Sequence, residues 1–142
     1  MSIFPTKILL ATDGSKEAQL AATTAADLAN STNSELHVVH VGEFMPTFLA
    51  QTELEPAELE REARRRLDEE VRRVEEAGGT LKEAHLRLGR ADEEIVDLAA
   101  DLDAGLIVMG SRGRGRIRRA LMGSVSDSVV RHAHCPVTIV RE

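Results

Sequence analysis

Short apolar runs recur along this chain and are separated by longer segments of mixed polarity. Aliphatic residues dominate at 8–11, 36–41 and 106–109, and each run is bounded by polar or glycine-containing turns. Runs of this length and composition are typical of buried β-strands. Two further strands are expected, one at 80–88, where apolar and polar residues alternate weakly, and one at 137–140, which follows a proline.

Helical periodicity fills the intervals between these strands. An alanine-rich segment after Ser15 repeats small residues at helical spacing, which would let a helix lie close to a sheet. Residues 55–77 combine an apolar stripe with acid-to-base pairs four residues apart, a pattern that predicts a helix with one solvated face. Shorter helices are predicted at 91–102 and 124–132.

Two serines are the expected N-caps of these helices. Ser15 precedes the alanine-rich helix, where its hydroxyl is suited to accept from the first free backbone N–H groups. Ser124 is followed three residues later by Asp127, which matches a capping box. Each cap predicts a helix that begins directly after a polar loop.

The alternation of strands and helices predicts the fold class. Parallel strands joined by helical crossovers give an α/β protein, a single domain with a five-stranded parallel sheet, helices on both faces and a Rossmann-like architecture. The length of 142 residues suits one such domain. Ligands of these sheets bind outside the carboxyl ends of the strands. Two polar, glycine-bearing loops, 12–15 and 110–124, are predicted to lie there.

Composition narrows the function classes. The single cysteine, Cys135, rules out an internal disulfide and fits a reducing, cytoplasmic compartment. No signal peptide or membrane span is indicated, so no membrane partner is expected. The formal net charge is −6, yet from residue 110 onward seven arginines face two acidic residues. An acidic body argues against a general nucleic-acid coat, whereas a local basic loop suits a small anion.

The basic stretch GSRGRGRIRRALMGS at 110–124 combines three kinds of anion-binding group. Its glycines let the backbone approach a ligand and present successive N–H groups. The helix predicted from Ser124 adds free N–H groups and a positive dipole end. The arginines add forked donors for phosphate oxygens. A flexible loop whose glycines only make turns explains the same residues, and the loop's chemistry alone does not decide between the two.

The spacing within this loop resembles a known nucleotide motif. Gly110-x2-Gly113-x9-Gly123-Ser124 matches the pattern G-x2-G-x9-G-[ST] of the universal stress protein family, whereas neither the P-loop nor the Rossmann fingerprint fits. The context agrees, because ILLATDGS at 8–15 looks like that family's opening and Cys135-Pro136 leads into the last strand. The resemblance covers essentially the whole chain.

This resemblance implies an adenine-nucleotide α-hydrolase-like fold and ATP as the bound cofactor. Adenine would lie near the end of the second strand, held by backbone groups at Val41, with Asp13 on the ribose side. The glycine loop would wrap the ribose and phosphates. The nucleotide-binding residues implied in this way are Ala11, Thr12, Asp13, Ser15, Val41, Met109, Gly110, Ser111, Arg112, Gly113, Arg114, Gly123, Ser124, Val125 and Ser126.

The family resemblance also implies protein partners. A homodimer would form through the last strand, Val137, Thr138, Ile139 and Val140. Pairing there is physically sensible because an unpaired strand edge is a liability. A regulatory protein whose nucleotide state is read by further, unidentified protein partners is the favoured function.

Catalysis is the main alternative to simple binding. Asp13 is the only carboxylate that the pattern places near the phosphates, where it could hold Mg²⁺ through water, although its simplest role is to form a turn and cap a helix. No general base is placed beside it, so slow ATP hydrolysis at most is expected. A weak ATPase or nucleotidyl transferase therefore stays open as an alternative.

Two other functions are weighed against nucleotide binding. The chain could be an interaction module that uses its arginine loop for a protein or, less in keeping with the acidic body, for nucleic acid. The cluster of His132, His134 and Cys135 could be a metal site, but three ligand types within four residues lack the spacing of a structural site. A helix end followed by a buried cysteine is the preferred interpretation of that cluster.

Overall fold

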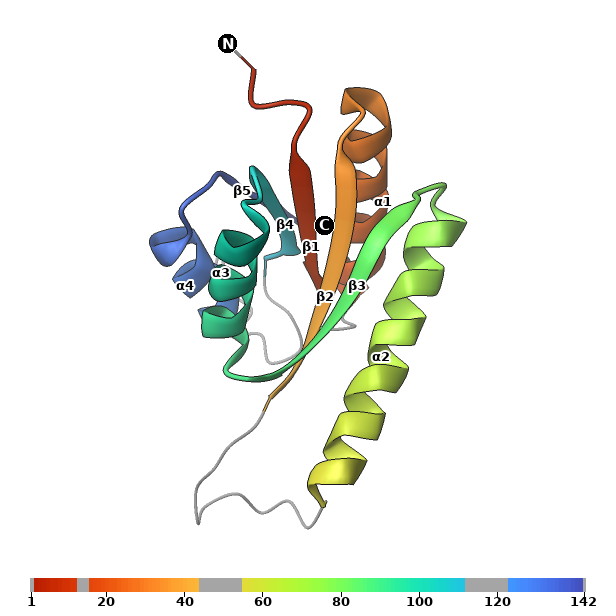
Figure 1. The fold of residues 1–142 in the computed structure, drawn as a ribbon, viewed down its shortest axis with the longest axis vertical. Coiled ribbons are helices and arrows are strands. Elements are labelled where there is room, and N and C mark those ends of the chain that lie inside the picture. The colour runs from red at the N-terminus through yellow and green to blue at the C-terminus, as the bar shows by residue number, and fades with distance from the viewer. Residues whose placement is uncertain (1, 13–15, 44–54, 112–122, 142) are drawn as a thin grey trace.

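The computed structural model describes residues 2–12, 16–43, 55–111 and 123–141 (Figure 1). Its strands are β1 (Lys7–Thr12), β2 (Glu35–Glu43), β3 (Leu81–Gly89), β4 (Leu106–Gly110) and β5 (Val137–Val140). Its helices are α1 (Lys16–Thr32), α2 (Pro56–Glu76), α3 (Ala91–Leu102) and α4 (Ser124–His132). The strands form one parallel sheet in the order β3-β2-β1-β4-β5. The predicted α/β fold class and element order are confirmed.

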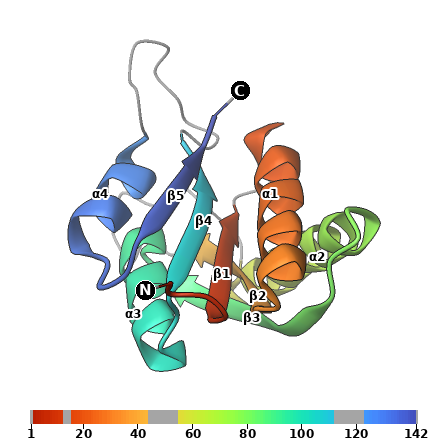
Figure 2. The ribbon, with the colours of Figure 1, turned by 90° about the horizontal axis from the view of Figure 1, so that it is seen from above.

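Two apolar layers hold the sheet between its helices. Side chains alternate along the strands, so Leu10 of β1 joins the cluster under α1 and α2, whereas its neighbour Leu9 joins the cluster under α3 and α4. Figure 2 shows the two helix pairs on opposite sides of the sheet. Because both faces are covered, the central strands are apolar throughout, as the sequence pattern indicated.

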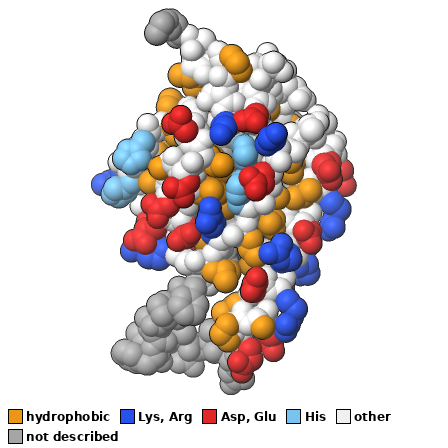
Figure 3. Space-filling model, in the orientation of Figure 1, with side chains coloured by type: hydrophobic (Ala, Val, Ile, Leu, Met, Phe, Trp, Pro, Cys, Tyr) orange, Lys and Arg blue, Asp and Glu red, His pale blue; other side chains and the backbone are white. Residues whose placement is uncertain are grey.

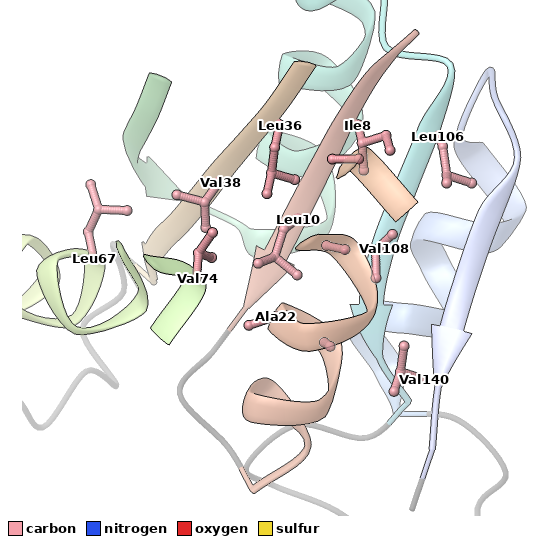
Figure 4. Packing of buried hydrophobic residues seen from close by; sticks show 13 residues of the cluster. Ile8, Leu10, Ala22, Leu36, Val38, Leu67, Val74, Leu106, Val108 and Val140 are labelled. Carbon is pink, nitrogen blue, oxygen red and sulfur yellow. The ribbon is translucent and has the colours of Figure 1, made fainter. Parts of the chain in front are cut away.

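The alanine-rich helix α1 lies close against the sheet. Ala21, Ala22 and Ala25 have no exposed surface, and they pack with Leu10 and Val108 in the first cluster (Figure 4). Small side chains on this face let the helix backbone approach the strands, while larger residues on α2, such as Val74, fill the space over β2 and β3.

The predicted capping box at α4 is wrong. The N-cap is Gly123, which has an extended backbone and no side-chain cap, so Ser124 is the first helical residue instead. Asp127 forms an ion pair with Arg131, at 3.0 Å between Oδ2 and Nε. The hydroxyl that returns to the N-cap carbonyl is that of Ser126, 3.2 Å from Gly123 O. Ser15, the other predicted cap, lies outside the described residues.

The charged face of α2 is confirmed in outline. Glu62 accepts from both Arg65 and Arg66, and Arg65 also reaches Glu69. One acid departs from the prediction of a solvated face, because Glu70 is buried and paired with Arg73. Among the described residues, no helix is both long and apolar enough to cross a bilayer.

Candidate functional site

The loop ends predicted to bind a ligand lie at the carboxyl edge of the sheet. Strands β1 and β4 are adjacent although they are distant in sequence, and the chain continues from them in opposite directions across the sheet. This is the topological switch point, where parallel sheets open a crevice between neighbouring loops. Thr12 ends β1 and Gly110 ends β4, so the structure brings the two predicted segments together.

Ser111 directly follows β4 at this edge of the sheet and has no exposed surface. Its Oγ donates to Glu17 Oε2 at 2.8 Å, and its backbone N–H donates to Val140 O at 3.0 Å. Its carbonyl accepts from Gly123 N at 2.5 Å and from Ser126 Oγ. These contacts, which we call the Ser111 junction, connect β4 to α1, β5 and α4 through one residue.

The Ser111 junction connects the two ends of the arginine loop, which is the basic stretch at 110–124. The loop leaves β4 at Ser111 and returns at Gly123, and the hydrogen bond between these two residues closes it at its base. Residues 112–122 between them, including Arg112, Gly113 and Arg114, lie outside the described residues, as do Asp13 and Ser15. The predicted phosphate loop therefore begins and ends on hydrogen-bonded backbone.

Glu17 is a site residue that the sequence analysis missed. It lies in the first turn of α1 and is 1% exposed, so its carboxylate requires partners such as the Ser111 hydroxyl. It also explains the first motif glycine, because a Cβ added at Gly110 would lie 3.1 Å from Glu17 Cβ. Glycine at 110 therefore has a packing reason besides any contact with a ligand.

The amino end of α4 presents backbone donors. The first N–H groups of any helix lack intrahelical partners, and Gly123, the N-cap residue here, has no side chain to cap them. Gly123 N is used by the Ser111 junction, whereas Ser124 is exposed and Val125 is half-buried at the start of the helix. Backbone N–H groups at Ser124 and Val125, together with the helix dipole, make this end suited to an anion.

A pocket of about 330 Å³ adjoins this helix start. It is open to one side and lies where the ends of β2 and β3 meet α3 and α4. Its walls combine opposite charges with small side chains; the lining residues are Glu43, Gly89, Arg90, Ala91, Asp92, Ser124, Val125 and Ser128. A volume of this order accommodates a small organic ligand. Only Ser124 and Val125 of this set were predicted, because the others carry no motif and meet only through the fold.

Asp92 is the most strongly held charge of the pocket. Burial opposes its ionisation, but hydrogen bonds from Ser128 Oγ at 2.7 Å and from the Glu93 backbone N–H favour the carboxylate. Arg90 adds an ion pair at 3.1 Å. Together these contacts hold the pKa of the Asp92 carboxyl below its usual value.

Ser128, Asp92 and His132 do not form a catalytic triad, although the three residue types are in contact. His132 Nδ1 lies 2.8 Å from the Ser128 carbonyl oxygen, which can only accept, so this nitrogen carries a proton. It cannot therefore take the proton of the Ser128 hydroxyl, which donates to Asp92 instead. The trio connects α3 to α4 and has no geometry for nucleophilic catalysis.

Other predicted residues have side chains that are buried or already hydrogen-bonded within the protein. Ala11, Val41 and Met109 are buried in the cluster under α3 and α4. Thr12 O lies 3.2 Å from Nδ1 of the buried His40, a second residue that the sequence analysis did not connect with the site. The hydroxyl of Ser126 is used by Ser111 O and Gly123 O. Direct ligand contacts by these residues stay predictions.

Comparison with known proteins gives one consistent family. The family model described as "Universal stress protein family" matches residues 5–141. A universal stress protein of Thermus aquaticus is 41% identical over 138 residues, covering 94% of this chain and 97% of that protein. Fifty-two curated proteins show significant sequence similarity to this chain, so the likeness does not depend on one relative.

Two solved structures show the same architecture. A universal stress protein in complex with cAMP has a TM-score of 0.72 and 26% identity, covering 97% of this chain and 98% of that one. The universal stress protein from Archaeoglobus fulgidus in complex with dAMP has a TM-score of 0.67 and 29% identity, covering 99% of each chain. Both bound molecules are adenine nucleotides.

Proposed function

This chain belongs to the universal stress protein family, and on that premise we propose that it is an ATP-binding regulatory protein of the stress response, acting in the cytoplasm. The amino end of α4, which has glycine as its N-cap residue and lies beside the Ser111 junction, is the observation that carries the proposal. It offers backbone donors at the switch point of a parallel sheet, where anionic ligands bind. The adenine nucleotides of two structural relatives support the choice of ligand class.

The proposed nucleotide spans the carboxyl edge of the sheet. Its phosphates lie between Gly110 and the amino end of α4, where Ser124 and Val125 donate backbone N–H groups. Adenine lies near the end of β2, at the backbone of Val41. The pocket between β2, β3, α3 and α4 extends from Ser124 and Val125 to Glu43 at the end of β2, which supports a ligand longer than a single phosphate.

Side chains of the two remaining loops complete this proposal. Asp13, which lies outside the described residues, would be on the ribose side and would hold Mg²⁺ through water, and Arg112 and Arg114, likewise outside them, would neutralise phosphate charge. The sequence places no general base beside Asp13, so the expected turnover is slow hydrolysis at most. The ligand therefore acts mainly as a bound signal that protein partners read.

One substitution tests the phosphate position without weakening the fold. Ser124→Asp places a negative charge at the first position of α4, which favours the helix but repels a phosphate. Ala57→Asp makes the same charge change in the first turn of α2 and serves as the matched control. Isothermal titration of nucleotide-free protein should show ATP affinity reduced by about tenfold or more in Ser124→Asp and unchanged in Ala57→Asp.

Two further ligands make the result specific. Adenosine lacks phosphates, so its weaker binding should be the same in wild type and in Ser124→Asp. Equal ATP affinity in the two proteins would contradict the phosphate position. Absence of ATP binding by the wild type would contradict the proposal and favour the arginine loop as a contact surface for protein or nucleic acid.

A further inference from the structure

A second cluster of chemically active side chains lies away from the nucleotide edge. His37 is on β2, and Glu83 and His85 are on β3. In the parallel register His37 is opposite Glu83 and Val39 is opposite His85, so all three side chains project from the same face of the sheet. Figure 3 shows histidine side chains near the middle of this face, among acidic and basic ones.

The three side chains converge on one small volume. His37 Nδ1 lies 3.1 Å from His85 Nε2, and His85 Nε2 lies 3.6 Å from Glu83 Oε1. All three ligand atoms lie within 4.8 Å of one another. Ligands of a tetrahedral ion with metal–nitrogen distances of 2.0–2.1 Å are separated by about 3.3 Å, so two of the three separations already match such a site.

Hydrogen bonding alone does not satisfy this cluster. His85 Nε2 faces both His37 Nδ1 and the Glu83 carboxylate, and it can donate at most one proton to one of them. If it accepts from His37 Nδ1–H instead, its lone pair is used in that bond. In either case one of its two contacts, to His37 Nδ1 or to the Glu83 carboxylate, is made without a shared proton. The buried His37 Nε2, which has no hydrogen-bond partner among the described residues, is not one of the converging atoms.

The surroundings of the cluster are shielded from water and acidic. His37 is 3% exposed, and the carboxylates of Glu35 and Glu83 lie close enough to act on its charge. Acidic neighbours therefore favour a positive charge at this place.

From this geometry we propose that His37, His85 and Glu83 form a binding site for a divalent transition-metal ion of the Zn²⁺ class. Two imidazoles and one carboxylate suit such an ion, and they are a poor set for Mg²⁺ or Ca²⁺, which take oxygen ligands. Glu83 has a 63% exposed side chain on an edge strand, so the ion enters from solvent and keeps an open coordination position.

This site is separate from the proposed nucleotide site. His37 precedes Val41 by four residues on the same strand, which places the two about 13 Å apart along β2. A metal ion bound here would connect the edge strand β3 to β2 through side chains of both strands. The test can therefore be made without nucleotide, and its outcome does not depend on whether ATP binds.

Titration of metal-free full-length protein with Zn²⁺, in competition with a chromophoric chelator, tests the site directly. We expect one equivalent of Zn²⁺ per chain. His85→Ala should weaken binding by about a hundredfold or more, and Glu83→Gln by about tenfold. His134→Ala removes an exposed histidine outside the cluster and should leave binding unchanged. Circular dichroism of each variant reports whether the fold is kept.

Two spectroscopic readouts keep the proposal testable if His85→Ala does not fold. Co²⁺ should give the intense visible bands of a four-coordinate ion, which Glu83→Gln should alter. In ¹⁵N spectra, Zn²⁺ should shift the ring nitrogens of His37 and His85 and leave those of His132 unchanged. No stoichiometric binding, binding that survives His85→Ala in a folded protein, or binding lost in His134→Ala would overturn the proposal.

Discussion

Ser111 lies where the predicted phosphate loop begins. Its hydroxyl has a packing role that the nucleotide motif does not indicate. Ser111 donates to the buried carboxylate of Glu17, while its backbone holds Val140 and Gly123. The motif predicted Ser111 as a ligand neighbour, and the structure shows its side chain connecting the first turn of α1 to the end of β4. A residue can therefore belong to a binding motif because it shapes the loop.

Removing the Ser111 hydroxyl should lower the free energy of unfolding. In Ser111→Ala, the buried Glu17 loses a donor, and we expect a loss of about 1–3 kcal/mol in the free energy of unfolding. Ser31→Ala, at an exposed position of α1, the helix that contains Glu17, should change the free energy of unfolding by less than about 0.5 kcal/mol. Urea denaturation measures both, and equal midpoints for the two variants would refute the role given to the Ser111 junction.

Asp92 should make stability depend on pH. Its pKa in the folded protein is below the ordinary value of 3.8, because the Ser128 and Glu93 hydrogen bonds and Arg90 outweigh burial. The carboxylate therefore contributes stability that is fully present above the unfolded pKa and is lost as pH falls through the lower folded pKa. Wild type should be more stable than Asp92→Asn near neutral pH, and the difference should shrink below about pH 4.

Urea denaturation of both proteins across this pH range measures the effect. Asp97→Asn alters an exposed residue of the same helix, and we expect its difference from wild type to stay small throughout. A stability difference between wild type and Asp92→Asn that does not change with pH would argue against the hydrogen-bonded carboxylate.

At the scale of elements, the hydrophobic pattern was sufficient for most of the fold. The bounds of α3, α4 and β5 match the prediction, because each segment is short and bordered by clear turn residues. Strand β2 continues to Glu43, beyond the predicted end at Val41, because pairing with β3 extends it past its apolar stretch. Pairing between distant strands is invisible in a local pattern.

The misplaced cap and the missed site residues have the same cause. Ser124 and Asp127 match a capping box locally, but in the fold Gly123, whose N–H donates to Ser111 O, is the N-cap residue and Ser124 is already helical. Glu17 and Asp92 are acidic residues in the first turns of their helices, and only the tertiary contacts with Ser111 and Ser128 give them a role. A single sequence contains no local signal for such contacts.

Close packing against Thr6 requires glycine at position 105. It precedes β4, and an added Cβ would overlap Thr6 Oγ1 and lie 3.0 Å from Thr6 Cβ and Cγ2. We expect Gly105→Ala to lower the free energy of unfolding by about 1–3 kcal/mol, because the neighbouring segment must shift. Combining it with Thr6→Ala should recover part of that loss in a double-mutant cycle, since most of the overlapping atoms are removed. Strict additivity would exclude the steric explanation.

At the scale of the whole molecule, the sheet has two exposed edges of different character. Strand β3 carries charged and histidine side chains, whereas β5 consists of Val137, Thr138, Ile139 and Val140. Charged residues discourage pairing with another chain, and a short apolar edge permits it. This contrast favours the prediction, made from the sequence, that two copies pair through β5.

A charge placed in the middle of β5 should prevent that pairing. Two copies of Thr138→Glu would bring like charges together across a two-fold axis, whereas Thr138→Val keeps the strand uncharged and β-branched. Sedimentation velocity should show a dimer for wild type and Thr138→Val, and a monomer for Thr138→Glu. A wild-type monomer at all concentrations, or a Thr138→Glu dimer, would contradict pairing through this edge.

The central claim is that the carboxyl edge of the sheet holds the phosphates of ATP. Backbone amide chemical shifts of ¹⁵N-labelled, nucleotide-free protein titrated with Mg²⁺-ATP test it most directly. The account predicts saturable shifts that are largest at Gly110, Gly123, Ser124 and Val125. Shifts confined to other regions, such as the outer face of α2, or no saturable shifts at all, would contradict it.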